Sequence, residues 1–156
     1  MNLPEPVAEA MTPLLDALHI DDAMEQLVVG TGASRDQIQV VEMVIANDAI
    51  RSKPALVAAL WLYVDELDRS HVISQQISDA TGSFWHGIMH RREGDFSNSH
   101  YWFRQVGAHP VMADIVGYDP HEFIDAVEAG DRSGVADLVG LQRREWEALF
   151  EWCCSE

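Results

Sequence analysis

The sequence predicts an all-α fold, and two observations support this prediction. Apolar residues recur at steps of three and four along most of the 156-residue chain, which is typical of the buried face of a helix. Nowhere do polar and apolar residues alternate as they do in a half-buried strand. Because this length suits one domain with a single core, we expect residues 1–156 to form one domain of six or seven helices.

Two helices are predicted at the start of the chain. Apolar residues spaced by three and four from Ala8 to Leu18 indicate the first helix, and the segment GTGAS at 30–34 interrupts the pattern. Ser34 and Gln37 have the spacing of a capping box, so we expect the second helix to begin there.

A third helix and a long connection come next. Pro54 near the start of an apolar run predicts a helix that continues without a break over residues 53–71. The polar segment ISQQISDATGS at 73–83 then predicts a connection of about a dozen residues. Loops of that length in a small domain more often serve a function than merely join two helices.

The second half predicts a helical hairpin and two further helices. The hairpin occupies residues 84–107, with its turn at Gly94–Asp95. Asp119 followed by proline predicts the start of a helix that runs to about Ala129. After the break GDRSG at 130–134, a final helix is indicated by apolar residues at helical spacing, namely Leu138, Leu141, Trp146, Leu149 and Phe150.

The hairpin resembles one tetratricopeptide repeat. Gly87 stands seven residues before the Gly94–Asp95–Phe96 turn, and Ser99 and Phe103 follow the turn at the spacing of that repeat. The small residues Gly87 and Ser99 allow close contact between the two helices, and the aspartate of the turn can cap the second one.

This resemblance has clear departures. His86 and His90 stand where the repeat usually has apolar residues or tyrosine, and Pro110 closes the unit one residue early. The only trace of a second copy is AGD at 129–131, whereas repeat arrays need about three copies for stability. We therefore expect a repeat-like hairpin within one domain and not a peptide-binding solenoid.

A second resemblance covers about residues 55–153. The segment at 65–110 contains WHGIMHRREGDFSNSHYWFR and, together with LQRREWEALFEWC at 141–153, is similar to a family of uncharacterised proteins found chiefly in bacteria. This resemblance implies that the domain is one unit and implies no mechanism.

Composition narrows the choice of partners. The formal charge of −16 argues against binding nucleic acid or an anionic membrane through bulk charge, so we expect a small-molecule partner and leave self-association open. The chain has no apolar run of transmembrane length, and its start lacks the features of a signal peptide, which predicts a cytoplasmic protein. Cys153 and Cys154 are adjacent and are interpreted as reduced thiols, with a metal role as the alternative.

One group of polar residues suggests metal chemistry. His86, His90 and Glu93 share one helix face, and imidazoles with a carboxylate are typical ligands of zinc or iron. Asp68 and His71, at the end of the preceding helix, would meet them if the two helices pack antiparallel. The candidate ligands of a divalent metal are therefore His71, His86, His90 and Asp68, and the candidate catalytic residues are His86, His90 and Glu93. The alternative to a metal site is that these histidines are solvated, or buried and hydrogen-bonded to one carboxylate.

The arginines and aromatic residues of the hairpin suggest ligand binding. An arginine pair can hold a carboxylate or phosphate through two parallel hydrogen bonds, although in this acidic chain arginines can equally neutralise internal acids. Aromatic rings offer flat surfaces for a sugar or aromatic ligand, although such rings more often belong to the core. The candidate ligand-binding residues are Arg91, Arg92, Arg104, Trp85, Tyr101 and Trp102. His100 and His109 could add acid–base capacity.

Three functions follow as hypotheses. The first is binding of a small polar or anionic ligand in a pocket lined by histidine and arginine, between the helix ending at His71 and the hairpin. The second is a metal-dependent hydrolase or isomerase that uses His71, His86 and His90. The third is a helical scaffold that recognises a protein partner through its tryptophans.

Overall fold

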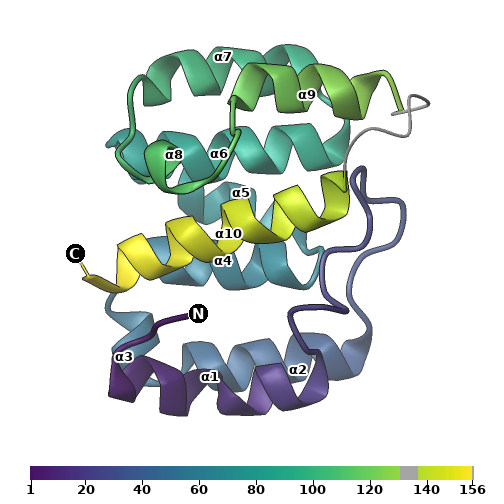
Figure 1. The fold of residues 1–156 in the computed structure, drawn as a ribbon. Coiled ribbons are helices and arrows are strands. Elements are labelled where there is room, and N and C mark those ends of the chain that lie inside the picture. The colour runs from purple at the N-terminus through teal and green to yellow at the C-terminus, as the bar shows by residue number, and fades with distance from the viewer. Residues whose placement is uncertain (131–136, 156) are drawn as a thin grey trace.

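The computed structural model describes residues 1–130 and 137–155, and in these ranges the chain forms helices without strands (Figure 1). The all-α prediction is therefore confirmed. In chain order the helices are α1 (Glu5–Ala17), α2 (Arg35–Ile45), α3 (Asp48–Arg51), α4 (Pro54–Tyr63), α5 (Leu67–Ser74), α6 (Ala80–Glu93), α7 (Phe96–Val106), α8 (Val111–Asp114), α9 (Pro120–Glu128) and α10 (Leu138–Ser155).

The helices form stacked layers around a shared apolar core (Figure 1). The pair α1 and α2 lies at one end, α4, α5 and α10 lie in the middle, and the hairpin of α6 and α7 lies at the other end beside α9. At the centre Trp146 of α10 packs against Tyr63, with ring centroids 5.0 Å apart, and donates its indole N–H to Ala59 O at 2.9 Å. Among the helices described, none is long and apolar enough to cross a membrane.

The helix starts that depend on local capping are where the sequence predicts them. Ser34 Oγ accepts from the backbone N–H of Gln37 at 3.2 Å, and the Gln37 side chain accepts from the Ser34 N–H at 2.8 Å. Asp119 caps α9 by accepting from the backbone of His121 and Glu122 at 2.8 and 3.0 Å. Of the break predicted at 130–134, residues 131–134 lie outside the described residues, as does the last residue of the faint repeat at 129–131.

The unbroken helix predicted over residues 53–71 is wrong. Helix α4 ends at Tyr63, Asp65 adopts a left-handed backbone conformation with φ of 65°, and α5 begins at Leu67. Arg92 of α6 binds both sides of this break, because it donates to Leu62 O at 2.6 Å and to the Asp65 carboxylate. This break and the four-residue helices α3 and α8 bring the described helices to ten, so the predicted six or seven is also too few.

The connection before the hairpin is shorter than predicted. Helix α5 continues to Ser74, and Asp79 caps α6 by accepting from the Gly82 N–H at 2.9 Å, so only residues 75–79 join the two helices. A Cβ atom on Gly82 would lie 2.1 Å from Ile77 O, so the chain can double back this tightly only with glycine there. The short loop sets α5 against α6.

The hairpin packs as its small residues predict. Gly87 lies against Phe103, and a Cβ atom on this glycine would be 2.8 Å from the phenyl ring. Ser99 Oγ donates to Gly87 O at 2.8 Å, and Gly94 in the turn has φ of 84°, which favours glycine. Helices α6 and α7 therefore approach closely, and α6 is buried between α5 and α7.

Candidate metal centre

Helices α5 and α6 bring three imidazoles together. His71 lies on α5, and His86 and His90 lie on successive turns of α6. Each offers a ring nitrogen that lies within 4.8 Å of the other two. The ring centroid of His71 is 4.7 Å from that of His86 and 5.4 Å from that of His90. The fold therefore brings together the three histidines that the sequence predicts to meet.

His86 is the most buried member of this group, with 3% of its surface exposed. Its Nδ1 atom is buried and makes no hydrogen bond within the described part of the chain. Trp102 of α7 stacks on the ring, with centroids 4.0 Å apart and planes at 15°. Burial, together with the neighbouring His90 and His71, lowers the pKa of His86 to about 4. His86 is therefore neutral near pH 7 and keeps a lone pair for a metal ion.

His90 is oriented by a carboxylate. Its Nδ1 atom lies 2.6 Å from Oε1 of Glu93, three residues further along α6. Because an ionised carboxylate only accepts hydrogen bonds, the Nδ1 atom carries the proton and the lone pair of the neutral ring is on Nε2. Histidine ligands of metals are commonly held by such an outer carboxylate. Glu93 thus has a positioning contact here and does not join the three imidazoles as a fourth ligand.

The aspartate predicted as a ligand is not part of the group. Asp68 is exposed on α5, and the described residues hold no set of mutually close ligand atoms that includes it. Asp95 does lie within 4.8 Å of both His90 and Glu93, but it caps α7 by accepting from the Asn98 N–H at 3.1 Å. Asp68 and His71 lie one turn apart on the same helix, but only His71 turns toward α6, where its ring contacts that of His86.

Arg91 is committed to an internal ion pair. Its guanidinium donates to both carboxylate oxygens of Glu145 on α10, at 2.8 and 2.5 Å, and both side chains are fully buried. The guanidinium also lies 3.9 Å from the centroid of the Phe123 ring, and Tyr118 donates its hydroxyl to Glu145 at 2.5 Å. Its bidentate partner is therefore a side chain of the protein.

Arg92 and Arg104 do not join Arg91 in an anion site either. Arg92 is fully buried and donates to Gln26 O at 3.2 Å, in addition to Leu62 O and the Asp65 carboxylate. Arg104 is exposed on α7 and makes no ion pair with the described residues. The contacts of Arg91 and Arg92 agree with the interpretation that these arginines neutralise acids within the protein. Neither guanidinium lines a pocket beside the three imidazoles.

The aromatic candidates divide between core and surface. Trp85 is fully buried, with its ring centroid 6.4 Å from that of Trp146, so it offers no flat surface to a ligand. Trp102 is half-buried beside His86, and Tyr101 is 47% exposed, with ring centroids 5.4 Å apart. Trp102 flanks the imidazole of His86, and Tyr101 contacts Trp102. The scaffold hypothesis needs exposed rings at Trp85 or Trp146, and both are buried.

The remaining histidines of the hairpin belong to other contacts. His100 Nδ1 lies 2.7 Å from His121 Nδ1, and His100 Nε2 lies 3.0 Å from the Asp125 carboxylate, which links α7 to α9. His109 Nε2 lies 3.2 Å from Thr81 Oγ1. Three polar partners of the hairpin residues are not indicated by any sequence pattern, because each lies at least 21 residues from the side chain that it contacts. They are His121, Asp125 and Glu145.

Comparisons of the chain with models of known protein families, with curated proteins and with solved structures each gave no match. The similarity to a chiefly bacterial family and to a tetratricopeptide repeat therefore stays a prediction.

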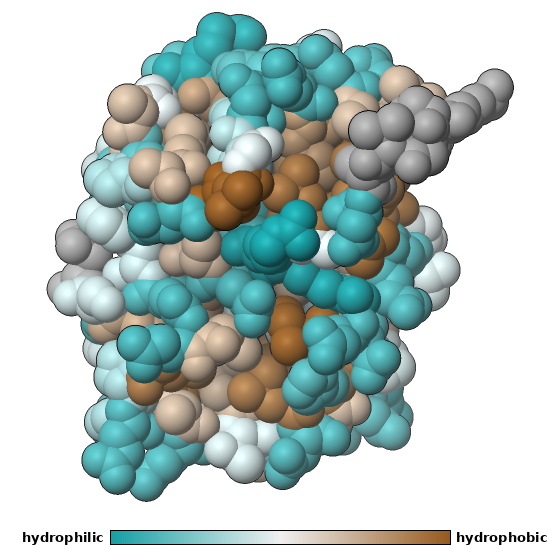
Figure 2. Space-filling model, viewed as in Figure 1, coloured by the Kyte–Doolittle hydropathy of each residue, from teal (hydrophilic) through white to brown (hydrophobic). Residues whose placement is uncertain are grey.

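On the face shown in Figure 2, hydrophilic side chains interrupt the apolar ones. The fold and the site together define an all-α domain with a cluster of three imidazoles between two helices.

Proposed function

We propose that this protein binds one divalent transition-metal ion through His71, His86 and His90. The observation that carries the proposal is the approach of three imidazole nitrogens to within 4.8 Å, one ring having a buried Nδ1 atom without a hydrogen bond in the described residues. Nitrogens around one zinc ion lie about 3.3 Å apart, given bonds of roughly 2.0 Å. The three nitrogens therefore need to approach one another by at most about 1.5 Å when a metal ion binds.

The ligand set indicates the kind of metal. Imidazole nitrogen suits zinc, copper, nickel and iron, whereas calcium and magnesium prefer oxygen ligands. Glu93 supports the site by holding the Nδ1 proton of His90, which directs Nε2 toward the ion. Trp102 supports it by fixing the plane of the His86 ring.

Metal-dependent hydrolysis is the second candidate function. Three protein ligands leave a fourth position for water, as in catalytic zinc sites, where the ion lowers the pKa of that water to about 7. The observation that favours it is the partial exposure of His71, which puts one edge of the site near solvent. Trp102 lies beside His86 and, together with the neighbouring Tyr101, offers a surface for part of a substrate.

The proposal is tested with protein purified without a histidine tag. Elemental analysis after zinc supplementation should find one ion per chain, and His86→Gln and His90→Gln should each abolish that stoichiometry. His19→Gln is the matched control, because His19 is exposed and lies away from the three imidazoles. Circular dichroism of each variant shows whether it is folded. Absence of stoichiometric metal in the folded protein, or unchanged uptake in the two site variants, would overturn the proposal.

A further inference from the structure

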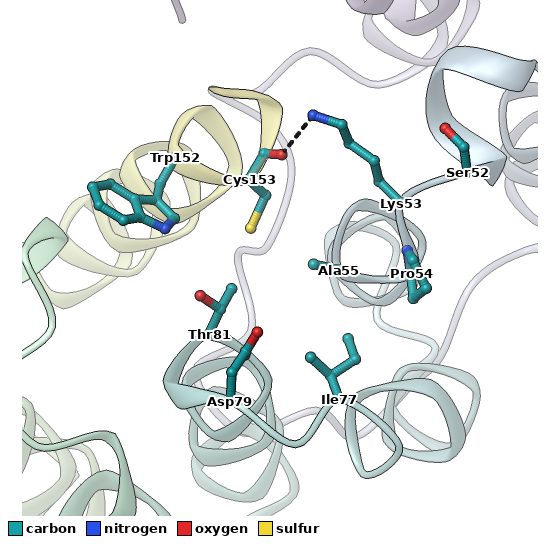
Figure 3. A pocket seen from close by; sticks show the side chains of 9 residues that line it. All are labelled: Ser52, Lys53, Pro54, Ala55, Ile77, Asp79, Thr81, Trp152 and Cys153. Carbon is teal, nitrogen blue, oxygen red and sulfur yellow. Dashed lines mark hydrogen bonds between the residues drawn. The ribbon is translucent and has the colours of Figure 1, made fainter. Parts of the chain in front are cut away.

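A pocket of about 290 Å³ opens where three helix ends meet, at the opposite end of α6 from His90 (Figure 3). The start of α4, the start of α6 and the end of α10 form its walls. The lining residues are Ser52, Lys53, Pro54, Ala55, Ile77, Asp79, Thr81, Trp152 and Cys153. This volume is near the lower limit of ligand pockets, so it suits a molecule of few heavy atoms.

Two residues of opposite charge line this pocket. Figure 3 shows Lys53 and Asp79 on opposite sides, with the Cys153 thiol between them. Both charges act on that thiol: Asp79 raises its pKa and Lys53 lowers it, while burial has the largest effect. The walls between the charges are mainly apolar and include Ala55 and Ile77.

Each charge keeps hydrogen-bonding capacity beyond its structural role. Lys53 Nζ donates to Cys154 O at 2.8 Å and to Cys153 O at 3.2 Å, which leaves one of its three N–H groups. Asp79 Oδ1 accepts from the Gly82 N–H, and Oδ2 has no hydrogen bond within the described ranges. One donor and one acceptor of full charge are thus available to a ligand.

We propose that this pocket binds a small amino carboxylate, with its ammonium group at Asp79 and its carboxylate at Lys53. The carbon chain of the ligand would contact Ala55 and Ile77. Such a zwitterion carries no net charge, so the acidity of the protein does not repel it. Charge-assisted hydrogen bonds at both ends provide the selectivity.

The pocket is a binding site and not a site of thiol chemistry. Burial raises the pKa of Cys153 to about 12, so its thiol stays protonated near pH 7. A protonated thiol is a poor nucleophile, and here it serves as part of the wall. The inference does not depend on the proposed metal centre, because the two sites share no residue.

Tryptophan indole signals in a nitrogen-correlated NMR spectrum report on both sites separately. Trp152 lines the pocket and Trp102 stacks on His86, so each provides its own signal among the five tryptophans. Metal-free protein is titrated with glycine, β-alanine and γ-aminobutyrate, and with propylamine and propionate as single-charge controls. We expect at least one amino carboxylate to shift the Trp152 signal saturably. Each single-charge control should bind about tenfold more weakly, because it lacks one charged hydrogen bond.

The decisive variant is Asp79→Asn, because asparagine can still cap α6 while its negative charge is gone. Affinity for the amino carboxylate should fall by about tenfold or more. Asp119→Asn makes the same change at the cap of α9 and should leave the affinity unchanged.

The inference is overturned if none of the three amino carboxylates gives a saturable shift at millimolar concentration. It is also overturned if propylamine or propionate binds equally well, or if Asp79→Asn has no effect. Whether zinc shifts the indole signal of Trp102 tests only the proposed metal centre, because Trp102 stacks on His86.

Discussion

The Nδ1 atom of His90 lies 2.6 Å from Oε1 of Glu93, one turn further along α6. This contact orients the ring of His90, whose centroid lies 5.4 Å from that of His71 and 4.8 Å from that of His86. Glu93 therefore supports the proposed metal site without being a ligand of the ion.

Replacing Glu93 by glutamine should weaken zinc binding by about 10–100-fold, the usual effect of removing an outer carboxylate. The amide oxygen can still accept from His90, but it carries no charge to strengthen the ligand. Isothermal titration calorimetry measures the affinity, with Glu128→Gln on α9 as the exposed control. An unchanged affinity in Glu93→Gln would show that Glu93 has no part in the site.

The metal-free protein should lose stability in mild acid because of His86. Its pKa is lowered from 6.5 to about 4 in the fold, so between these values the unfolded chain binds the proton and the folded chain does not. This contribution is complete above about pH 6.5 and declines as the pH falls toward 4, with a limiting slope of about 1.4 kcal/mol per pH unit. Urea denaturation across this range measures the slope. His86→Gln should have a smaller slope, and an identical slope would contradict the assignment.

The buried ion pair of Arg91 and Glu145 should be costly to break from one side. Arg91→Met leaves a fully buried carboxylate without its cation, which should lower the free energy of unfolding by about 3–5 kcal/mol. Adding Glu145→Gln to that variant should restore part of the loss, because the uncompensated charge is then removed. Urea denaturation of the single and double variants tests this, and a single variant as stable as the parent would refute it.

The two cysteines should react slowly in the folded protein. Burial raises the pKa of Cys153 to about 12 and that of Cys154 to about 11, so few thiolates are present near pH 8. We expect alkylation by iodoacetamide to be much slower in native than in urea-unfolded protein, as followed by mass spectrometry. Rapid native labelling of either thiol would contradict this description of the C-terminal end of α10.

Local signals in the sequence predict much of the fold. The capping box of Ser34 and Gln37, the cap at Asp119 and the turn at Gly94 each depend on residues within a few positions, and the structure has all three. The missed features depend on distant partners. At the end of α4, Arg92 binds the carbonyl of Leu62, 30 residues away, and no local pattern reveals this contact.

The same limit applies to the candidate site. His86 and His90 are predicted together because helical spacing puts them on one face, and their approach to His71 requires only that α5 and α6 pack side by side. Asp68 is misplaced because its side chain is exposed to solvent, whereas His71, one turn later on α5, contacts His86 of α6. The partner of Arg91 lies 54 residues away, so the sequence leaves its role open between a ligand site and an internal ion pair.

X-ray absorption at the zinc edge of the loaded protein tests the central claim most directly. We expect the ion to be surrounded by nitrogen and oxygen atoms at about 2.0 Å, with the multiple scattering of three imidazole rings. A sulfur neighbour at about 2.3 Å would place the metal at Cys153 or Cys154 instead. That result, or a spectrum without imidazole scattering, would contradict a metal centre formed by His71, His86 and His90.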